Sequence, residues 1–391
     1  MKKVLIVLGA IAFAAVVFFF VRVAGFYQKI YSPKSTVVKK APVVKNTYNV
    51  LLLGYGGGNH DGTYLTDTMI LAHIDLKKKL AVLISIPRDV WVKVPTKSGA
   101  DFHTKINSVY EMELFPKQYP DVQSKDLTSN IVAGITGLQV DNYITVDFDG
   151  FVKAVDILGG VDVNVEKTFT DVRYPVDGKE KDLCGKDDQF KRVEPYLEKR
   201  NDPSPERDAF FKDHADLQEF FDNIENKPQE AFPCRYETLS FTKGVTHMDG
   251  TTGLKYARSR YGVGDGGDFG RAARQQRVIE AVKLKVLSIG FIPKIIPLLG
   301  ELETHIKTDI PGEQMKRFLD QAPQANNYKI INLVMTDNDW LKGGRSADGQ
   351  FILIPEAGAD TWSGVQLWLK NAVNGIVITP SPTPGPAQKK K

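Results

Sequence analysis

The chain has 391 residues, of which 42% are hydrophobic, so it can bury the core of one large domain or of two small ones. Its formal net charge is +4, and the charged residues are spread along the chain rather than gathered in blocks. This pattern argues against nucleic acid as a partner, because nucleic-acid binding needs a concentrated basic surface.

Residues 1–25 predict a transmembrane anchor. Lys2 and Lys3 precede an apolar stretch from Val4 to Val21, and about 18 such residues are near the lower limit for crossing a bilayer. Basic residues before the stretch favour a cytoplasmic N-terminus. A cleaved signal peptide is the alternative. We therefore predict a single-pass protein of the cell membrane with the remaining chain on the extracellular side.

Residues 26–47 contain Lys, Ser and Pro and predict a stalk, and residues 48–378 predict one extracellular domain. Apolar runs rich in Val, Ile and Leu predict strands at 49–53, 68–74, 80–86, 143–148 and 161–165. Residues 150–158 have helical spacing, and Gly159-Gly160 ends that helix. Strands mixed with helices predict an α/β fold, a three-layer sandwich whose central mixed sheet is flanked by helices.

The segment "GYGGG" after the first strand has the glycine content of a phosphate-binding loop. It lacks Gly-Lys-Ser/Thr, and a strand rather than a helix follows it, so it is neither a P-loop nor a dinucleotide fingerprint. A flexible hairpin-like turn is predicted, although such a glycine run still lets the backbone approach an anion. Asp67, at the start of the next strand, is either a turn-capping residue or a metal ligand.

The segment "LISIPRDVWV" indicates a ligand site. Pro87 ends a core strand, so Arg88 lies at the carboxyl end of that strand, where open α/β sheets place their ligands. An ordinary surface pair of Arg88 with Asp89 is the alternative. Lys105 precedes a predicted helix and by itself indicates only a solvated charge.

From about residue 170 to residue 242 the sequence is charged, with few sustained apolar runs, and predicts a partly helical surface insertion. Cys184 and Cys234 lie within it, and in an oxidising compartment they can pair. Two unpaired buried thiols are the alternative. Metal binding is less favoured, because neither cysteine has a second Cys or His nearby in the sequence.

Residues 250–257 and 269–289 predict helices. Arg258 and Arg260 follow the first helix, where a loop can aim both at one phosphate. On the second helix, Arg271 and Gln275 share a stripe with apolar residues 278, 279, 282 and 286, so both are predicted to face inward. The tail at 379–391 is rich in Pro and Lys and predicts disorder.

Buried guanidinium groups need partners, and the carboxylates near these arginines are Asp265 and Asp268. The surplus of positive charge indicates an anionic ligand, and arginine forks suit phosphate oxygens. A structural network of Arg and Asp is the alternative.

Seven segments together, in this order, resemble the LytR-CpsA-Psr family. They are "NVLLLG", "TDTMIL", "LISIPRDVWV", "KINSVYE", "VDFDGFVKAVDILGGVDV", "MDGTTGLKYARSRY" and "DFGRAARQQRVIEAV". The resemblance implies an enzyme that transfers a glycopolymer from a polyprenyl-pyrophosphate carrier to peptidoglycan and forms a phosphodiester. It also implies an apolar tunnel for the lipid beside the sheet.

The resemblance also assigns roles to residues. It implies Mg²⁺ (or Mn²⁺) coordination by Asp67 and a catalytic role for Arg88, with proton transfer by Asp268 or Asp89. Pyrophosphate binding is implied for six residues: Arg88, Lys105, Arg258, Arg260, Arg271 and Gln275.

Two positions depart from the family pattern. An Asp is expected soon after the first strand, where this chain has Gly56, and an Arg is expected two places before Asp67, where it has Leu65. Asp61, in the same loop, is a candidate replacement metal ligand. Two alternatives therefore stay open beside the transferase: a polyprenyl-pyrophosphate hydrolase, and a non-catalytic envelope protein that binds anionic lipid or polymer.

Overall fold

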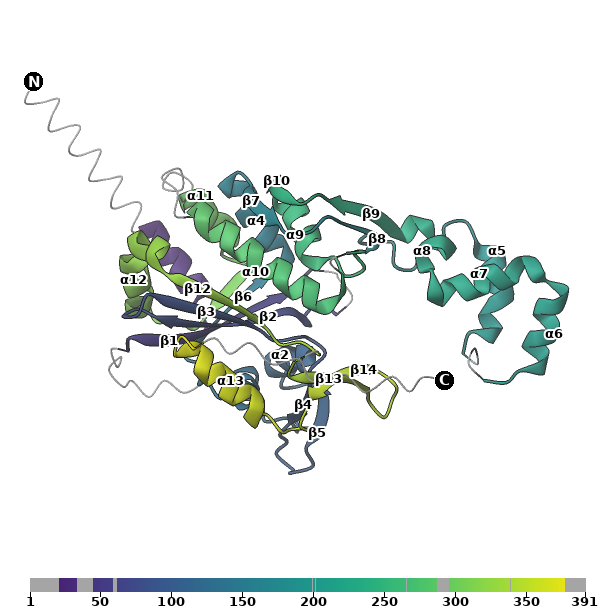
Figure 1. The fold of residues 1–391 in the computed structure, drawn as a ribbon, viewed down its shortest axis with the longest axis horizontal. Coiled ribbons are helices and arrows are strands. Elements are labelled where there is room, and N and C mark those ends of the chain that lie inside the picture. Colours follow the sequence, from purple (N-terminus) through teal and green to yellow (C-terminus); the bar gives the residue numbers. More distant parts are fainter. Residues whose placement is uncertain are drawn as a thin grey trace, which may run out of the picture. The chain divides into compact units, whose positions relative to one another are not determined.

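The computed structural model describes residues 21–33, 45–58, 62–198, 200, 202–264, 266–286, 295–337 and 339–376. The chain divides into two compact units. The first comprises residues 1–163, 247–257 and 272–391, and the second comprises residues 164–246 and 258–271. Figure 1 shows the elements of both units.

A six-stranded mixed sheet forms the centre of the first unit. Its strands follow in the order β11 (Ile306–Thr308), β6 (Asn142–Asp147), β1 (Thr47–Tyr55), β2 (Thr66–Asp75), β3 (Leu80–Ser85) and β12 (Lys329–Val334). β1 pairs antiparallel with β2, as β2 does with β3 and β6 with β11, whereas the pairs β1–β6 and β3–β12 are parallel. The predicted central mixed sheet is thus confirmed.

The strand predicted at 161–165 is not part of that sheet. It is β7 (Val161–Val165), which pairs with β10 (Gly244–Met248) in a two-stranded sheet. The hairpin-like turn predicted after the first strand is confirmed, because β1 and β2 are consecutive antiparallel strands.

Apolar side chains cover both faces of the central sheet. On one face, α12 (Gly312–Gln321) packs on Tyr48 and Val50, and Ile279 of α10 (Gly267–Val286) packs on Ile70 and its neighbours. On the other face, Leu51, Leu71 and Ile84 are fully buried. Figure 1 shows α2 (Val109–Leu114) and α13 (Ser363–Val373) on that side of the sheet. Helices therefore flank the sheet, as the apolar runs predict.

Two helices of the first unit meet at a glycine. α4 (Phe148–Leu158) begins where Asp147 accepts a hydrogen bond from the backbone N–H of Gly150, and it ends at Gly159, whose φ of 78° is left-handed. α9 (Gly250–Arg258) approaches α4 so closely that a Cβ on Gly250 would lie 2.2 Å from the carbonyl oxygen of Val152. The glycine of "MDGTTG" is therefore required by packing.

Smaller elements complete the first unit. β4 (Trp91–Val94) and β5 (Phe102–Lys105) form an antiparallel hairpin in which Trp91 faces Lys105. A second hairpin joins β13 (Leu341–Arg345) to β14 (Phe351–Pro355). The helices α3 (Leu127–Thr136) and α11 (Ile295–Leu302) also belong to this unit.

The second unit contains a strand pair and a helical lobe. β8 (Phe169–Pro175) and β9 (Tyr236–Phe241) are antiparallel. The helical lobe, residues 176–235, holds α5 (Asp187–Val193), α6 (Pro205–Asp213), α7 (Ala215–Asn226) and α8 (Pro228–Ala231). Its own apolar core consists of Val193, Phe211, Leu217, Phe220, Phe221, Ala231 and Phe232.

The predicted pairing of the two cysteines is confirmed. Cys184 and Cys234 form a disulfide with their Cα atoms 5.5 Å apart. The alternative of two unpaired thiols is thereby excluded.

The predicted single-pass membrane location is corrected. Within the described residues, no helix has both the length and the apolar character needed to cross a bilayer. Residues 21–30 are helical, so this helix covers the described end of the predicted anchor, residues 21–25, and the start of the predicted stalk. The rest of the anchor, residues 1–20, and the predicted tail at 379–391 lie outside the described residues.

Candidate functional site

Four charged side chains meet in the first unit where β2 begins and β3 ends. Arg88 is the third residue after β3, and its guanidinium Nη1 donates to Oδ1 of Asp67 on β2 at 2.6 Å. Because β2 and β3 are antiparallel neighbours, the start of one strand lies beside the end of the other. This pairing places the predicted metal ligand against the predicted phosphate-binding arginine.

Asp89 and Lys105 extend this contact into an ion cluster. The Nζ of Lys105 donates to Oδ1 of Asp89 at 2.7 Å, and Nε of Arg88 is 3.5 Å from Oδ2 of the same carboxylate. Asp89 is 95% buried. Lys105 is therefore more than a solvated charge. The four residues Asp67, Arg88, Asp89 and Lys105 carry two charges of each sign, so the surplus of positive charge that the sequence suggests is not present among them.

A carboxylate that the sequence analysis missed lies beside the glycine loop. A Cβ on Gly57, whose φ is 68°, would lie 2.8 Å from the Cβ of Asp147. Asp147 ends β6, next to β1 in the sheet, and His305 Nδ1 lies 2.9 Å from both of its oxygens. No local pattern marks Asp147, because the loop and the carboxylate meet only through strand pairing. The proposed replacement ligand Asp61 lies outside the described residues.

Tyr55 ends β1 at the same loop. Burial, followed by the negative charge of Asp147, raises the pKa of Tyr55 to about 12. Its hydroxyl is therefore neutral near pH 7 and is able to donate a hydrogen bond.

In the second unit, Asp171 of β8 fixes the backbone of the segment that carries two predicted phosphate-binding arginines. Its Oδ2 accepts hydrogen bonds from Oγ of Ser259 at 2.6 Å and from the backbone N–H groups of Arg260 and Tyr261, each at 3.1 Å. Asp171 is fully buried. The sequence prediction placed it in a surface insertion, because the apolar residues Phe169, Val172 and Tyr174 do not alternate regularly and so do not reveal the strand.

The side chains of these arginines lie among aromatic and acidic groups. Nη1 of Arg258 is 3.4 Å from the hydroxyl of Tyr174 and 3.8 Å from a carboxylate oxygen of Asp177. Burial raises the pKa of Tyr174 to about 12, and the positive charge of Arg258 acts in the opposite direction. The guanidinium of Arg260 lies 6.0 Å from the ring of Tyr261, over the face where cations are attracted.

The inward orientation predicted for two residues of α10 is confirmed. Arg271 and Gln275 are buried, with 5% and 9% of their surface exposed. The sequence analysis missed Arg274, which is fully buried and donates from Nε to the carbonyl of Tyr256. It also missed Gln276, whose amide donates to Ser85 Oγ at 2.8 Å. Residues 274, 278 and 281, at helical spacing and all buried, form the stripe that would have revealed Arg274.

The predicted site residues thus fall in both units. Asp67, Arg88, Asp89 and Lys105 meet in the first unit, where Gln275 also lies. Arg258, Arg260 and Arg271 belong to the second unit. The convergence of all six phosphate-binding residues stays a prediction, and the side chain of Asp268 lies outside the described residues.

The carboxylates fit a magnesium ion only in one mode of binding. In the described part of the chain, the cluster of three metal-binding residue types is Asp182, Cys184 and Cys234, and the disulfide removes both thiolates. Asp67 is the predicted ligand that remains, and it is engaged by Arg88. Mg²⁺ commonly binds through one or two carboxylates together with water and substrate phosphates. The donor set therefore fits a magnesium ion that is held largely by a bound pyrophosphate.

The comparisons with known proteins agree on one family. The LytR_cpsA_psr family model matches residues 18–356. The chain is 24% identical over 324 residues to the polyisoprenyl-teichoic acid–peptidoglycan teichoic acid transferase TagU of Enterococcus faecalis, a match that covers 79% of this chain and 80% of that protein. It is 26% identical over 302 residues to TagV of Bacillus subtilis, which bears the same transferase name, but that match covers 76% of this chain and 59% of that protein.

Solved structures agree on the fold. The crystal structure of B. subtilis TagV matches with a TM-score of 0.51 at 22% identity, over 85% of this chain and 99% of that one. Protein gbs0355 of Streptococcus agalactiae matches with a TM-score of 0.54 at 18% identity, over 86% of this chain and 90% of that one. At these identities the likeness concerns the mixed α/β fold alone.

Proposed function

The chain belongs to the LytR-CpsA-Psr family, and from this membership and the ion cluster we propose that it is a glycopolymer transferase. Its donor is a glycopolymer on a polyprenyl-pyrophosphate carrier, and its acceptor is peptidoglycan. The names of the TagU and TagV relatives, which are teichoic acid transferases, support this class of reaction.

The contact of Arg88 with Asp67, next to the buried pair of Asp89 and Lys105, is the observation that carries the proposal. A guanidinium and an ammonium are held at fixed positions at the end of a buried strand. Fixed cations stabilise the charge that develops on a pyrophosphate when one of its bonds breaks, and they need no reorganisation at that moment.

The proposed reaction is a displacement at phosphorus. The 6-hydroxyl oxygen of a muramyl residue forms a bond to the phosphorus next to the glycopolymer, and the bond from that phosphorus to the polyprenyl phosphate oxygen breaks. The products are a phosphodiester and a polyprenyl monophosphate. Arg88 and Lys105 bind phosphate oxygens, and in doing so the guanidinium of Arg88 exchanges its contact with Asp67 for the substrate.

Asp67 would hold Mg²⁺ once its contact with Arg88 is exchanged. The ion supplies additional neutralisation of pyrophosphate charge when it is bound. The hydroxyl proton is taken by Asp89 or by Asp268. Asp268→Asn distinguishes the two: loss of turnover with donor binding unchanged assigns the proton to Asp268, whereas unchanged turnover assigns it to Asp89.

The test incubates the purified protein with a lipid-pyrophosphate-linked oligosaccharide, peptidoglycan oligomers and Mg²⁺. The expected product is oligosaccharide joined to peptidoglycan through a phosphodiester, and Asp67→Ala abolishes its formation. A phosphate-terminated sugar with no transfer product would instead identify a hydrolase.

The absence of a carboxylate at Gly56 favours a second candidate, a protein that binds such donors without turning them over. Tight donor binding with no product, unchanged by Asp67→Ala, would support this candidate and overturn the transferase.

A further inference from the structure

A cavity of about 810 Å³ lies in the first unit, away from the four residues of the ion cluster. Its apolar floor is formed by Val92 of β4 and by three residues of α3, Leu127, Ile131 and Ile135. We call this cavity the α3 groove. None of the roles considered above uses it.

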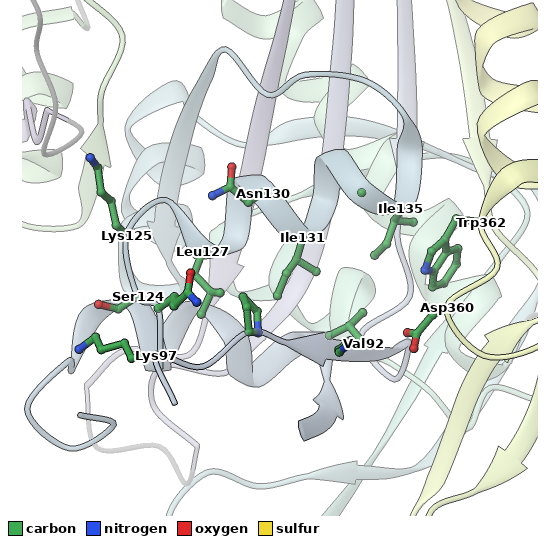
Figure 2. A pocket seen from close by; sticks show the side chains of 14 residues that line it. Val92, Lys97, Ser124, Lys125, Leu127, Asn130, Ile131, Ile135, Asp360 and Trp362 are labelled. Atoms are coloured by element: carbon green, nitrogen blue, oxygen red, sulfur yellow. The ribbon is translucent and has the colours of Figure 1, made fainter. Parts of the chain in front are cut away.

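The α3 groove has two different ends. Figure 2 shows Lys97 and Lys125 toward one end, and Asp360 and the indole of Trp362 toward the other. Asn130, which also lines it, offers an amide. With an apolar floor, an aromatic ring and a few polar groups, the groove has the composition of a ligand site.

The charged side chains that line the groove favour an anionic ligand. Lys93, Lys97 and Lys125 line it, whereas Asp360 is its one lining carboxylate. Lys93 is 3.2 Å from Asp101, and Nζ of Lys97 donates to the carbonyl of Pro120. Lys125 makes no hydrogen bond or ion pair with the residues that the structure describes, so its ammonium is available for a ligand.

The β4–β5 hairpin connects the groove to the ion cluster. Alternation along a strand places Trp91 and Lys93 on one face of β4, and their cross-strand partners are Lys105 and His103. Lys93 lines the groove, and Lys105 contacts Asp89 of the cluster. A single hairpin therefore carries residues of both the groove and the cluster, and Val92, on its other face, is about 10 Å along the chain from Asp89.

A second contact ties the aromatic end of the groove to the same hairpin. Nε2 of His103 lies 2.9 Å from Oδ2 of Asp360, and the ring of His103 stacks on Trp91 with the centroids 6.3 Å apart. Trp362 follows Asp360 by two residues and is the N-cap of α13. These contacts join Asp360, two residues before the indole, to the hairpin.

We propose that the α3 groove binds the acceptor, a peptidoglycan strand with N-acetylated sugars and carboxylates. The C–H groups of a pyranose ring carry partial positive charge and match the negative face of the Trp362 ring. Acetyl methyl groups contact the floor at Ile131, which is partly exposed above the buried side chains of Val92, Leu127 and Ile135, and Asn130 pairs with the acetamido group. The carboxylates of the stem peptides lie at Lys97 and Lys125. This inference rests on the proposed function for the identity of the glycan.

The test measures binding of a soluble, uncross-linked peptidoglycan oligosaccharide to the protein by calorimetry, without any donor. Trp362→Leu keeps the apolar volume and removes the ring, and Lys125→Ala removes the cation that has no described partner. Each is expected to weaken binding about 10-fold, and in the transfer assay each raises the KM for the acceptor with little change in kcat. Lys117→Ala, an exposed lysine outside the groove, is the matched control and leaves both unchanged.

A neutral oligomer of N-acetylglucosamine separates the two contributions, since it should respond to Trp362→Leu but not to Lys125→Ala. Unchanged binding of the peptidoglycan fragment by both variants overturns the proposal. Weaker binding of the donor glycopolymer, with binding of the peptidoglycan fragment unchanged, also overturns it. If the wild-type protein binds the fragment in this way but transfers nothing, the groove assignment stands and the proposed function fails. If transfer occurs and neither variant alters transfer, the proposed function stands and the groove assignment fails.

Discussion

Each cation of the ion cluster already contacts a carboxylate, and in the proposed reaction this would decide how a pyrophosphate binds. Arg88 contacts Asp67 and Asp89 through different nitrogens, and Lys105 contacts Asp89. In that reaction phosphate oxygens would compete with Asp67 for the guanidinium, while Asp89 would keep both cations in place. Asp89 is in this sense a positioning residue, whether or not it also accepts a proton.

Arg88→Lys tests the need for the guanidinium fork. A lysine keeps the charge but presents one compact ammonium, which does not reach both carboxylates as the planar fork does. We expect kcat/KM for transfer to fall about 10- to 100-fold, the equivalent of one charged hydrogen bond. Transfer within twofold of the wild-type rate would contradict a role for the fork. Lys117→Ala serves again as the control.

Asp171→Asn tests how the segment of Arg258 and Arg260 is held. The Asn amide keeps one acceptor oxygen and replaces the other with an NH2 donor. In either orientation this donor faces groups that Asp171 now satisfies, either the N–H of Arg173 or the donors of Ser259, Arg260 and Tyr261. Amide hydrogen exchange at residues 260 and 261 should accelerate at least about 10-fold. Asp162→Asn, at an exposed carboxylate, should leave these rates unchanged.

His73 makes stability depend on pH. It is 93% buried on β2, and burial lowers the pKa of its imidazole, whose Nδ1 lies 2.7 Å from Oδ1 of Asn49. The folded state therefore favours the neutral ring, and below the ordinary pKa of about 6.5 the unfolded state binds more protons. Stability should fall as the pH drops from about 7.5 to about 5.5, and it should fall less steeply in His73→Gln. The same dependence of the unfolding free energy on pH in the two proteins would refute this.

At the scale of elements, the crossing of α4 and α9 depends on a missing side chain. Gly250→Ala places a Cβ against the backbone of Val152, which has no flexible end that can move away. We expect the free energy of unfolding to fall by about 1–3 kcal/mol or more. Gly134→Ala in α3 is the matched control, because nothing lies within 4 Å of its Cβ. It should be neutral or stabilising by about 0.5–1 kcal/mol.

At the scale of the whole molecule, the disulfide joins the two ends of the helical lobe. Cys184 and Cys234 are separated by 50 positions, and closing a loop of that length removes unfolded-state entropy worth about 4 kcal/mol at most. A Cys184→Ser, Cys234→Ser double variant should expose the lobe to limited proteolysis, with cleavage confined to residues 176–235. Reducing agent should reproduce this in the wild-type protein and have no effect on the variant. Equal protease resistance of the lobe in the two proteins would contradict a stabilising role.

The sequence alone determined four of the six central strands, β1, β2, β3 and β6, and the helix α4 with its glycine end, because buried strands and capped helices leave short patterns that do not depend on distant residues. It did not reveal β11 and β12. It also indicated that Arg271 and Gln275 face inward, since helical spacing ties them to apolar neighbours. The seven family segments and their order predicted the family, and the family model then matched the chain.

Only the tertiary structure decided which charges meet. Asp171 and Ser259 are 88 positions apart, and Asp147 and His305 are 158 positions apart, so no local period records either contact. The structure also separated β7 from the central sheet and placed Asp147 beside the glycine loop. Strand pairing and helix packing bring such residues together, and both depend on the arrangement of the entire core rather than on any one segment.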